Sequence, residues 1–300
     1  MILIIGSEDE LHSKHVYNAI KSKRLDAEYF DSRKYPNSIS LSYDEETNGY
    51  IKTDNKKIYL KDIQGIYWRW FYGIKREYIE NDYVSNMIFR ERTSALNSLF
   101  CSLKCNRVNS YEAIELHKTK AYQLNILKEN GIRIPKTIIT NDKESLIAFY
   151  ENNNRNVIYK PVLGGAMTTR LTDNDLTVER LNELQMSPVQ LQEFIAGVDI
   201  RVFAMGDEVF AAEIQADTID FREDKQAKII PVELPENIKQ DCLKVLKLLK
   251  LSYSGIDIRK TKDNDYVFIE ANPAPMFIHF ENITHYPITD KIIELLTQKI

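Results

Sequence analysis

The amino-acid sequence predicts an α/β (α+β) fold, and two stretches of the chain carry that prediction. Near the N-terminus, an apolar run at residues 2–5, helical spacing over 9–23 and a strand pattern at 27–30 form a β-α-β succession, which is typical of a parallel sheet. From residue 189 onward, strand patterns dominate and helical patterns interrupt them. The strand patterns of this second stretch lie at residues 189–195, 200–205, 208–215, 253–260 and 265–270.

The elements after the β-α-β opening alternate between strand and helix patterns. Apolar residues alternate over 39–60 around Asn48-Gly49, which indicates a β-hairpin. A further strand is predicted at 63–71, and a helix is predicted over 80–104 because its apolar residues share one face. The polar stretch 106–110 is typical of a linker, so we place the first domain boundary there.

The central part of the chain begins with a predicted helix over 111–130. Gly131 supplies its C-terminal cap, and Pro135 prevents its continuation. Besides the strand patterns after residue 189, two further strands and three further helices are predicted in the rest of the chain. The strands are expected at 136–140 and 156–160, and the helices at 142–151, at 235–250 and at the C-terminus through Ile292, Leu295 and Leu296.

Composition narrows the class of protein. The 300 residues are 43% hydrophobic, which is enough for a sizeable core. Lys and Arg number 40 against 44 Asp and Glu, and this net charge of −4 argues against a general nucleic-acid or membrane-surface binder. No apolar run approaches the roughly 20 residues that span a bilayer, and the N-terminus lacks the pattern of a signal peptide. We therefore expect a cytoplasmic protein.

The three cysteines do not indicate a disulfide framework, because their number is odd and low. Cys101 and Cys105 lie one helical turn apart, and His117 follows them. A zinc site from these three residues lacks a fourth ligand at a usable spacing. We therefore expect buried structural thiols, Cys242 included.

Three oxygen-bearing side chains near the C-terminus are candidate metal ligands. Asp257 and Glu270 stand on two consecutive predicted strands and come opposite one another if these strands pair about the turn 262–265. Asn272 lies two residues after Glu270 and therefore shares its face. Such a set of hard oxygen ligands suits Mg²⁺, which takes substrate phosphates and waters as further ligands. The alternative is a solvated hairpin with ordinary surface acids.

Two other segments are candidates for binding a nucleotide. Lys160 ends an apolar strand and precedes Gly164-Gly165, a pair whose backbone N–H groups can approach a phosphate closely. The alternative is a hairpin turn with an exposed lysine, and the loop is not a Walker A motif. The strand end at 192–195 can offer its backbone N–H and C=O groups to adenine, or it is an edge strand with polar outward positions.

The order of these segments resembles the ATP-grasp superfamily, over about residues 111–300, with a pre-ATP-grasp domain before it. The segments that carry the resemblance are Lys120 on the helix before Gly131–Pro135, Lys160-Pro161 with Gly164-Gly165, Gln192–Ile195, Asp199-Ile200-Arg201, and Asp257 with Glu270-Ala271-Asn272-Pro273.

Within the superfamily, the chain looks most like the MvdD-like graspetide synthetases, peptide ligases that macrocyclise microviridin-type precursors. The chain departs from that family's pattern at two places. The family often has Asp-Trp-Arg where this chain has Asp220-Phe221-Arg222. It often has Asn-Pro-Asn-Gly where this chain has Asn272-Pro273-Ala274-Pro275, and the second proline removes backbone freedom after Asn272. The segments of closer resemblance are Ile66–Trp70, Lys120–Leu124, Phe210–Ile214 followed by Asp220–Arg222, and Glu281 with Tyr286–Ile288.

The resemblance implies a pre-ATP-grasp domain over 1–108, a central ATP-grasp subdomain over 109–195 and a C-terminal subdomain over 196–300. It also implies ATP and Mg²⁺ as cofactors. The expected roles are phosphate binding by Lys120, Lys160, Gly164 and Gly165, adenine binding by Gln192, Glu193, Phe194 and Ile195, ribose or substrate contact by Asp199, Mg²⁺ binding by Asp257, Glu270 and Asn272, and catalysis by Arg201 and Arg222.

The activity that the resemblance implies is an ATP-dependent, ADP-forming ligation. Asp or Glu side chains of a ribosomal precursor peptide, with leader and core, would be activated as acylphosphates and joined to Ser, Thr or Lys as ω-esters or ω-amides. One alternative is a RimK-like amino-acid ligase that adds amino acids to a peptide or protein. Another is a non-catalytic ATP-binding regulatory module. We expect no nucleic-acid or membrane partner and leave a homodimer open.

Overall fold

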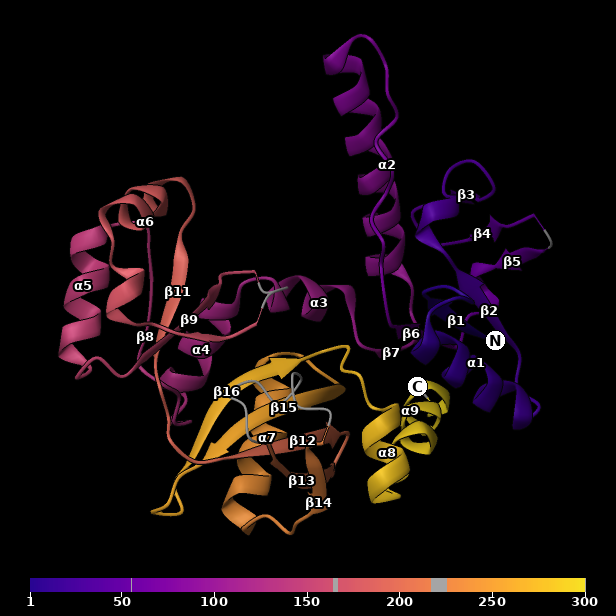
Figure 1. The fold of residues 1–300 in the computed structure, drawn as a ribbon. Coiled ribbons are helices and arrows are strands. Elements are labelled where there is room, and N and C mark those ends of the chain that lie inside the picture. The colour runs from indigo at the N-terminus through magenta and orange to yellow at the C-terminus, as the bar shows by residue number, and fades with distance from the viewer. Residues whose placement is uncertain (55, 164–166, 217–225, 300) are drawn as a thin grey trace. The chain divides into compact units, whose positions relative to one another are not determined.

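The computed structural model describes residues 1–54, 56–163, 167–216 and 226–299, and its contacts divide the chain into two compact units (Figure 1). Unit 1 comprises Met1–Ile114, Lys250–Tyr253 and Pro273–Ile300. Unit 2 comprises Glu115–Leu249 and Ser254–Asn272. Within the described residues, no helix has the length and apolar character needed to cross a membrane.

Unit 1 is built on a parallel sheet with the strand order β2-β1-β6-β7. The predicted β-α-β opening is confirmed, since β1 pairs in parallel with β2 and the helix between them is formed. All four residues of β1 are buried, because strands on both sides and apolar layers on both faces enclose it. The elements are β1 (Ile2–Ile5), α1 (Leu11–Ser22), β2 (Ala27–Phe30), β6 (Gly65–Trp68) and β7 (Asn106–Val108).

The predicted linker at 106–110 is wrong, because residues 106–108 form β7 beside β6. Two of its three residues are polar, so the sequence shows no apolar strand pattern. Its polar groups are satisfied within unit 1, where the Asn106 side-chain amide donates to the Gln298 carbonyl and Ser252 Oγ donates to the Arg107 carbonyl. A strand of this composition depends on such distant partners.

A small antiparallel sheet follows the opening, with the strand order β3-β4-β5. The hairpin at Asn48-Gly49 forms, but its loop covers residues 44–48, since Tyr43 pairs with Gly49. The Asp44 carboxylate accepts hydrogen bonds from the backbone N–H groups of Glu46 and Asn48 and so shapes this longer loop. The strands are β3 (Ser40–Tyr43), β4 (Gly49–Lys52) and β5 (Lys57–Tyr59).

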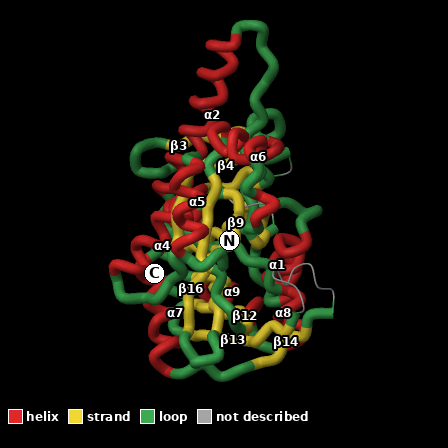
Figure 2. The backbone as a smooth tube through the Cα atoms, turned by 60° about the vertical axis from the view of Figure 1, so that its left-hand side comes forward, coloured by secondary structure: helices red, strands yellow, loops and turns green. Residues whose placement is uncertain are grey.

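Helices complete unit 1. The C-terminal part of α2 (Asp82–Ser102) buries Leu96, Leu99 and Phe100 in the core, whereas its N-terminal part extends away from the sheet (Figures 1 and 2). The sequence did not predict α8 (Ile278–Thr284), and it predicted α9 (Ile288–Thr297), whose Leu296 is fully buried. The expectation of buried thiols holds for Cys242 in unit 2 and is wrong for Cys101, which is exposed.

The described residues of unit 2 form two sheets. The first has the strand order β10-β9-β11-β8, and Leu146 of α5 (Lys143–Asn152) shares its apolar core with Leu191 of β11. The second has the order β14-β13-β12-β15-β16. The strands of the first sheet are β8 (Thr137–Thr140), β9 (Val157–Pro161), β10 (Thr169–Arg170) and β11 (Val189–Glu193). Those of the second are β12 (Val198–Met205), β13 (Glu208–Gln215), β14 (Lys228–Pro231), β15 (Tyr253–Lys260) and β16 (Tyr266–Asn272).

The single helix predicted over 111–130 is wrong, because the chain forms two helices. They are α3 (Tyr111–His117) and α4 (Lys120–Glu129). The break places Lys120 in the first turn of α4, and Gly131 follows this helix with the positive φ of 78° that its cap position requires. The helices α6 (Val178–Glu183) and α7 (Glu236–Leu248) complete the unit.

Candidate active site

An ion pair between α4 and β16 stands at the centre of the candidate site. Lys120 Nζ donates to Glu270 Oε1 at 2.8 Å, and His117 Nε2 lies 3.8 Å from the same oxygen. Burial by itself raises the pKa of Glu270, but the charges of Lys120 and Lys160 and the Lys120 hydrogen bond outweigh it and lower the pKa. Glu270 is therefore a carboxylate at neutral pH. Burial lowers the pKa of His117.

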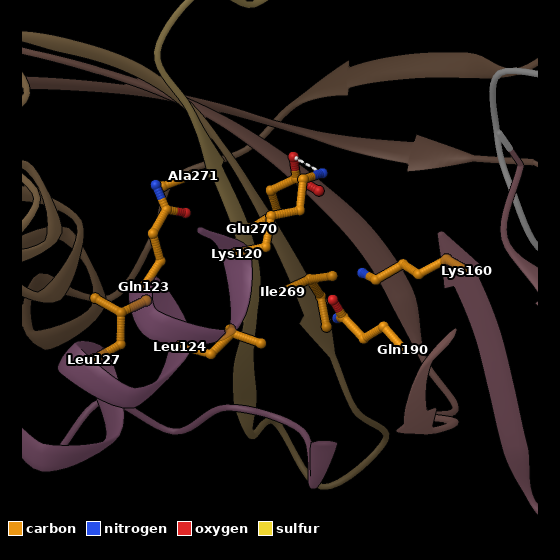
Figure 3. Close-up of a pocket in the computed structure, with 9 residues that line it drawn as sticks. All are labelled: Lys120, Gln123, Leu124, Leu127, Lys160, Gln190, Ile269, Glu270 and Ala271. Carbon is orange, nitrogen blue, oxygen red and sulfur yellow. Dashed lines mark hydrogen bonds and ion pairs between the residues drawn. The ribbon is translucent and has the colours of Figure 1, made fainter. Parts of the chain in front are cut away.

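A pocket adjoins this ion pair (Figure 3). Lys120, Lys160 and Glu270 give it charge, Gln123 and Gln190 give it amides, and the rest of its lining is apolar. The side chains of Lys160 and Gln190 both point toward Ile269 in the close-up. Two ammonium groups beside apolar side chains suit a ligand that has both an anionic part and an apolar part.

The strands β15 and β16 bring the predicted metal ligands to one face. Asp257 pairs directly with Glu270, as the sequence predicts, and a β-bulge follows this pair. Asn272 pairs with Gly255, two positions further along β16. Arg201 on β12 donates to Asp257 Oδ1 at 2.5 Å, so the second carboxylate also has a cationic neighbour.

This donor set fits a divalent cation such as Mg²⁺, which prefers carboxylate and amide oxygens. Across the residues that the structure describes, no cluster of three or more His, Cys, Asp or Glu side chains could hold a metal. The set of Asp257, Glu270 and Asn272 is not such a cluster, because it has only two carboxylates and its third member is an amide. A cation held there would take its remaining ligands from water and from phosphate oxygens.

The segment predicted to bind adenine is the end of β11 and the residues after it. Gln192 is buried and donates to Thr137 Oγ1 at 3.0 Å. Glu193 accepts from the backbone N–H of Lys136 at 2.8 Å. The Phe194 ring lies 4.2 Å from the Arg170 guanidinium, so a cation–π contact holds this side chain. The segment is thus anchored at several points.

Asp199 and Ile195 both contact Arg259. Arg259 Nη1 lies 2.5 Å from Asp199 Oδ2, and Arg259 Nε donates to the Ile195 carbonyl at 3.1 Å.

Three of the predicted site residues, Gly164, Gly165 and Arg222, lie outside the described residues.

Sequence reasoning missed three side chains around the pocket. His117 ends α3 beside Glu270, Gln123 lies one turn into α4, and Gln190 lies on β11 opposite Lys160. Only Gln190 left a signal in the sequence, because Gln190-Leu191-Gln192 puts two amides on one face of an otherwise apolar strand.

Comparison with protein-family models assigns both the class of protein, that of the ATP-grasp ligases, and the family. Residues 117–296 match the RimK-like ATP-grasp domain, and residues 1–115 match the MvdD pre-ATP-grasp domain. The chain therefore belongs to the RimK-like ATP-grasp family and carries an MvdD pre-ATP-grasp domain, as the sequence resemblance predicts. Its enzyme class is that of the ADP-forming ATP-grasp ligases.

Solved structures of similar proteins cover nearly the whole chain. The ATP-grasp ligase PsnB complexed with a minimal precursor is 29% identical, with a TM-score of 0.84 over 98% of this chain and 97% of PsnB. Another PsnB structure contains Mg and ADP. A RiPP-associated ATP-grasp ligase from Chryseobacterium gregarium, in complex with ADP and a leader and core peptide, is 26% identical, with a TM-score of 0.83 over 98% of this chain and 95% of that protein.

Curated relatives include amino-acid ligases. The α-aminoadipate–LysW ligase LysX of Sulfurisphaera tokodaii is 26% identical over 221 residues, which are 70% of this chain and 78% of LysX.

Proposed function

We propose that this protein is an ATP-dependent peptide ligase that macrocyclises a ribosomal precursor peptide. The observation that carries the proposal is the MvdD pre-ATP-grasp domain joined to a RimK-like ATP-grasp domain in one chain. Solved ligases with precursor peptides cover 98% of the chain, which supports a peptide as the substrate. An Asp or Glu side chain of the peptide would be the acceptor of the phosphoryl group.

The reaction would proceed in two transfers. An oxygen of the peptide carboxylate attacks the γ-phosphorus of ATP, the bond to the β,γ-bridging oxygen breaks, and ADP leaves. A Ser or Thr hydroxyl or a Lys amine then attacks the carbonyl carbon of the acylphosphate, loses its proton, and inorganic phosphate leaves. The products are an ω-ester or an ω-amide, ADP and phosphate. Such transfers depend mainly on alignment and on neutralised oxygen charge.

The described residues can supply that neutralisation. Lys120 and Lys160 line the pocket and would hold the phosphates of ATP. Asp257, Glu270 and Asn272 would hold Mg²⁺, which when bound supplies charge stabilisation on phosphate oxygens. Arg201, held beside Asp257, would face the γ-phosphate or the carboxylate.

Four further roles rest on the sequence resemblance. Arg222 is proposed to grip the acceptor carboxylate with its planar fork, and Gly164-Gly165 to cover the phosphates. The segment Gln192–Ile195 is proposed to hold adenine, and Asp199 to contact the ribose or the substrate.

A second candidate is an amino-acid ligase that adds amino acids to a peptide or protein. The likeness to LysX favours it, because that relative is an aminoadipate ligase. The third hypothesis, a non-catalytic ATP-binding module, receives no support, since the family consists of ligases.

One experiment separates the two ligase candidates. The purified protein is incubated with ATP, Mg²⁺ and a peptide encoded beside its gene that contains repeated Thr, Glu, Asp or Lys residues. We expect mass spectrometry to show the loss of one water per ring formed. Growth of the peptide by whole amino-acid residues, with free amino acid supplied, would establish the second candidate instead.

A further inference from the structure

Two buried glutamines on β11 have side-chain oxygens that nothing in the described structure satisfies. Gln190 and Gln192 are each 1% exposed, and the Oε1 atoms of both lack a hydrogen-bond partner among the described residues. A buried polar atom without a partner is costly, so such atoms in a folded protein call for an explanation. Gln190 lines the pocket together with Lys120, Lys160 and Glu270.

The position of Gln190 in the sheet relates it to the phosphate-binding groups. It pairs directly with Lys160 on the antiparallel strand β9, so both side chains stand on the same face. Figure 3 shows both side chains directed toward Ile269, with the Lys120–Glu270 pair beyond. An amide and a cation therefore lie side by side on the pocket lining.

We propose that Gln190 reads the 6-position of the nucleotide base and makes the site selective for adenine. This inference rests on the proposed function, since it assumes that the pocket takes ATP. A glutamine amide pairs with adenine at two points, because its oxygen accepts from the 6-amino group and its nitrogen donates to N7. The orphan Oε1 of Gln190 is the acceptor that this pairing needs.

Purines with a 6-oxo group cannot make both bonds. Guanine and hypoxanthine present two acceptors, O6 and N7, on the same edge. Whichever way the Gln190 amide turns, its oxygen then faces an acceptor. That oxygen has no partner in the nucleotide-free protein, would stay unpaired with a 6-oxo purine and would gain a hydrogen bond only with adenine, and this difference is the basis of selection.

The test compares binding of ADP and IDP, which differ at the 6-position, by calorimetry with Mg²⁺ present. The wild-type protein is expected to bind ADP about tenfold or more tightly than IDP. Gln190→Met keeps the shape of the side chain and removes the amide, so the ratio should fall about fivefold or more, mainly through weaker ADP binding. Gln240→Leu, at an exposed position on α7, is the control and should keep the ratio.

A second measurement distinguishes this role from a structural one. Removing an unsatisfied buried amide should leave the melting temperature of the nucleotide-free protein equal or raised, while the ADP-bound protein loses stabilisation. Gln190→Leu provides the same test if the methionine variant does not fold. An unchanged ADP-to-IDP ratio in these variants, with ADP still bound, would overturn the role of Gln190 alone. Failure of the wild-type protein to bind either nucleotide would overturn the proposed function as well.

Discussion

At the scale of single residues, Glu270 concentrates the electrostatics of the site. Its carboxylate accepts from Lys120, lies near His117 and feels the charge of Lys160. These contacts keep it ionised in spite of its burial. Because this carboxylate is already ionised at neutral pH, it can exchange the Lys120 ammonium for a metal ion without first losing a proton.

Replacing Glu270 with glutamine should remove turnover and leave the fold largely intact. The amide keeps the shape of the side chain but loses the charge that a divalent cation needs. We expect ligase turnover to fall by more than about a hundredfold, since even replacing a side chain that only orients a metal ligand costs about 10- to 100-fold. Peptide product measured at several Mg²⁺ concentrations, with circular dichroism as the check on folding, tests this. Full activity at ordinary Mg²⁺ would contradict the metal assignment.

Replacing Lys160 with alanine should weaken nucleotide binding. Hydrogen bonds to charged groups contribute about 1.5–3 kcal/mol, so ADP affinity should fall about tenfold or more. Isothermal titration with ADP measures the change. The exposed Lys143 on α5 offers a matched control, and Lys143→Ala should bind ADP as the wild type does. Equal affinity in the Lys160 variant would mean that its ammonium does not contact phosphate.

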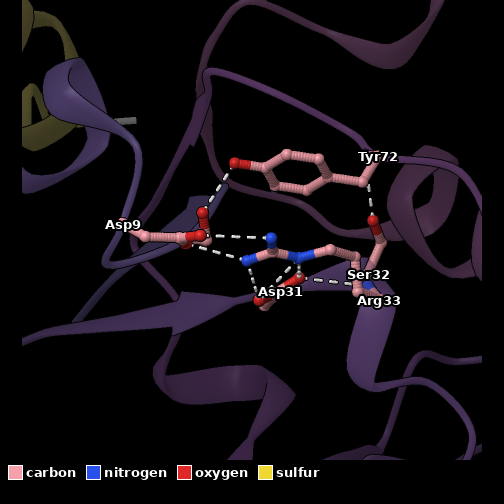
Figure 4. Close-up of polar contacts among 6 residues, drawn as sticks. Asp9, Asp31, Ser32, Arg33 and Tyr72 are labelled. Atoms are coloured by element: carbon pink, nitrogen blue, oxygen red, sulfur yellow. Dashed lines mark hydrogen bonds and ion pairs between the residues drawn. The ribbon is translucent and has the colours of Figure 1, made fainter.

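At the scale of elements, polar contacts fix the loop that follows β1. The Arg33 guanidinium bridges Asp9 and Asp31, with contacts of 2.8 and 2.7 Å, and lies 4.2 Å from the centre of the Tyr72 ring (Figure 4). The Tyr72 hydroxyl in turn lies 2.6 Å from Ser7 Oγ. These contacts join the carboxyl ends of neighbouring strands.

Arg69 after β6 and His12 in α1 anchor the segment that follows β16. Arg69 is 5% exposed, donates through Nε to Glu10 at 3.1 Å and donates through Nη1 to the carbonyls of Ala274 and Pro275. His12 Nε2 accepts from the backbone N–H of Phe277 at 3.0 Å. The chain that leaves the candidate metal strand is therefore held by buried hydrogen bonds from unit 1 side chains.

Glu10 gives this anchor a pH dependence. Burial raises its pKa, but the contacts with His12, Arg69 and Ser13 outweigh burial and hold the pKa well below the usual range. Because the folded-state pKa is depressed, the stabilisation is fully present above the unfolded value of about 4.3 and is lost as the pH falls below it. Glu10→Gln should lower the free energy of unfolding by about 2 kcal/mol at neutral pH, and the difference from wild type should shrink below about pH 4.3.

Urea unfolding across a pH series measures this difference. The exposed Glu8→Gln is the control and should match the wild type throughout. A difference between wild type and the Glu10 variant that stays constant down to pH 3 would contradict the role of the ionised carboxylate.

At the scale of the whole molecule, unit 1 is assembled from segments far apart in the chain. Its sheet uses residues before 109, whereas α9 comes from the last part of the sequence and packs on β6, β7 and α1. The backbones of α9 and β6 approach each other so closely that a Cβ added at Gly65 would lie 2.5 Å from the Leu296 carbonyl oxygen. The C-terminal helix is thus part of the N-terminal core. The predicted division into 1–108, 109–195 and 196–300 stays a prediction.

Leu296→Ala should therefore destabilise unit 1, although the substitution lies nearly 200 residues from the strands that it affects. The leucine is fully buried, and truncating such a side chain costs about 2–5 kcal/mol. Hydrogen exchange of the β6 and β7 amides should increase in this variant. The exposed Glu294→Ala on the same helix should leave exchange unchanged. Protected β6 and β7 amides in the Leu296 variant would show that α9 is dispensable for the sheet.

The sequence by itself determined the features that depend on local pattern. The β-α-β opening follows from apolar spacing over 30 residues, and the pairing of Asp257 with Glu270 follows from one short turn between two alternating strands. Both need contacts only between neighbours in the chain, so periodicity and turn chemistry are sufficient. The order of the motifs was likewise enough to indicate the family.

Tertiary structure alone decided the rest. The polar strand β7 exists because β6 and distant side chains satisfy its backbone, and α3 ends before Lys120, which pairs with a carboxylate 150 residues further along. Arg69 binds carbonyls more than 200 residues away, and the Gln190 oxygen is both buried and without a partner among the described residues. Burial and long-range partners are properties of the folded chain, and a linear pattern of residues does not contain them.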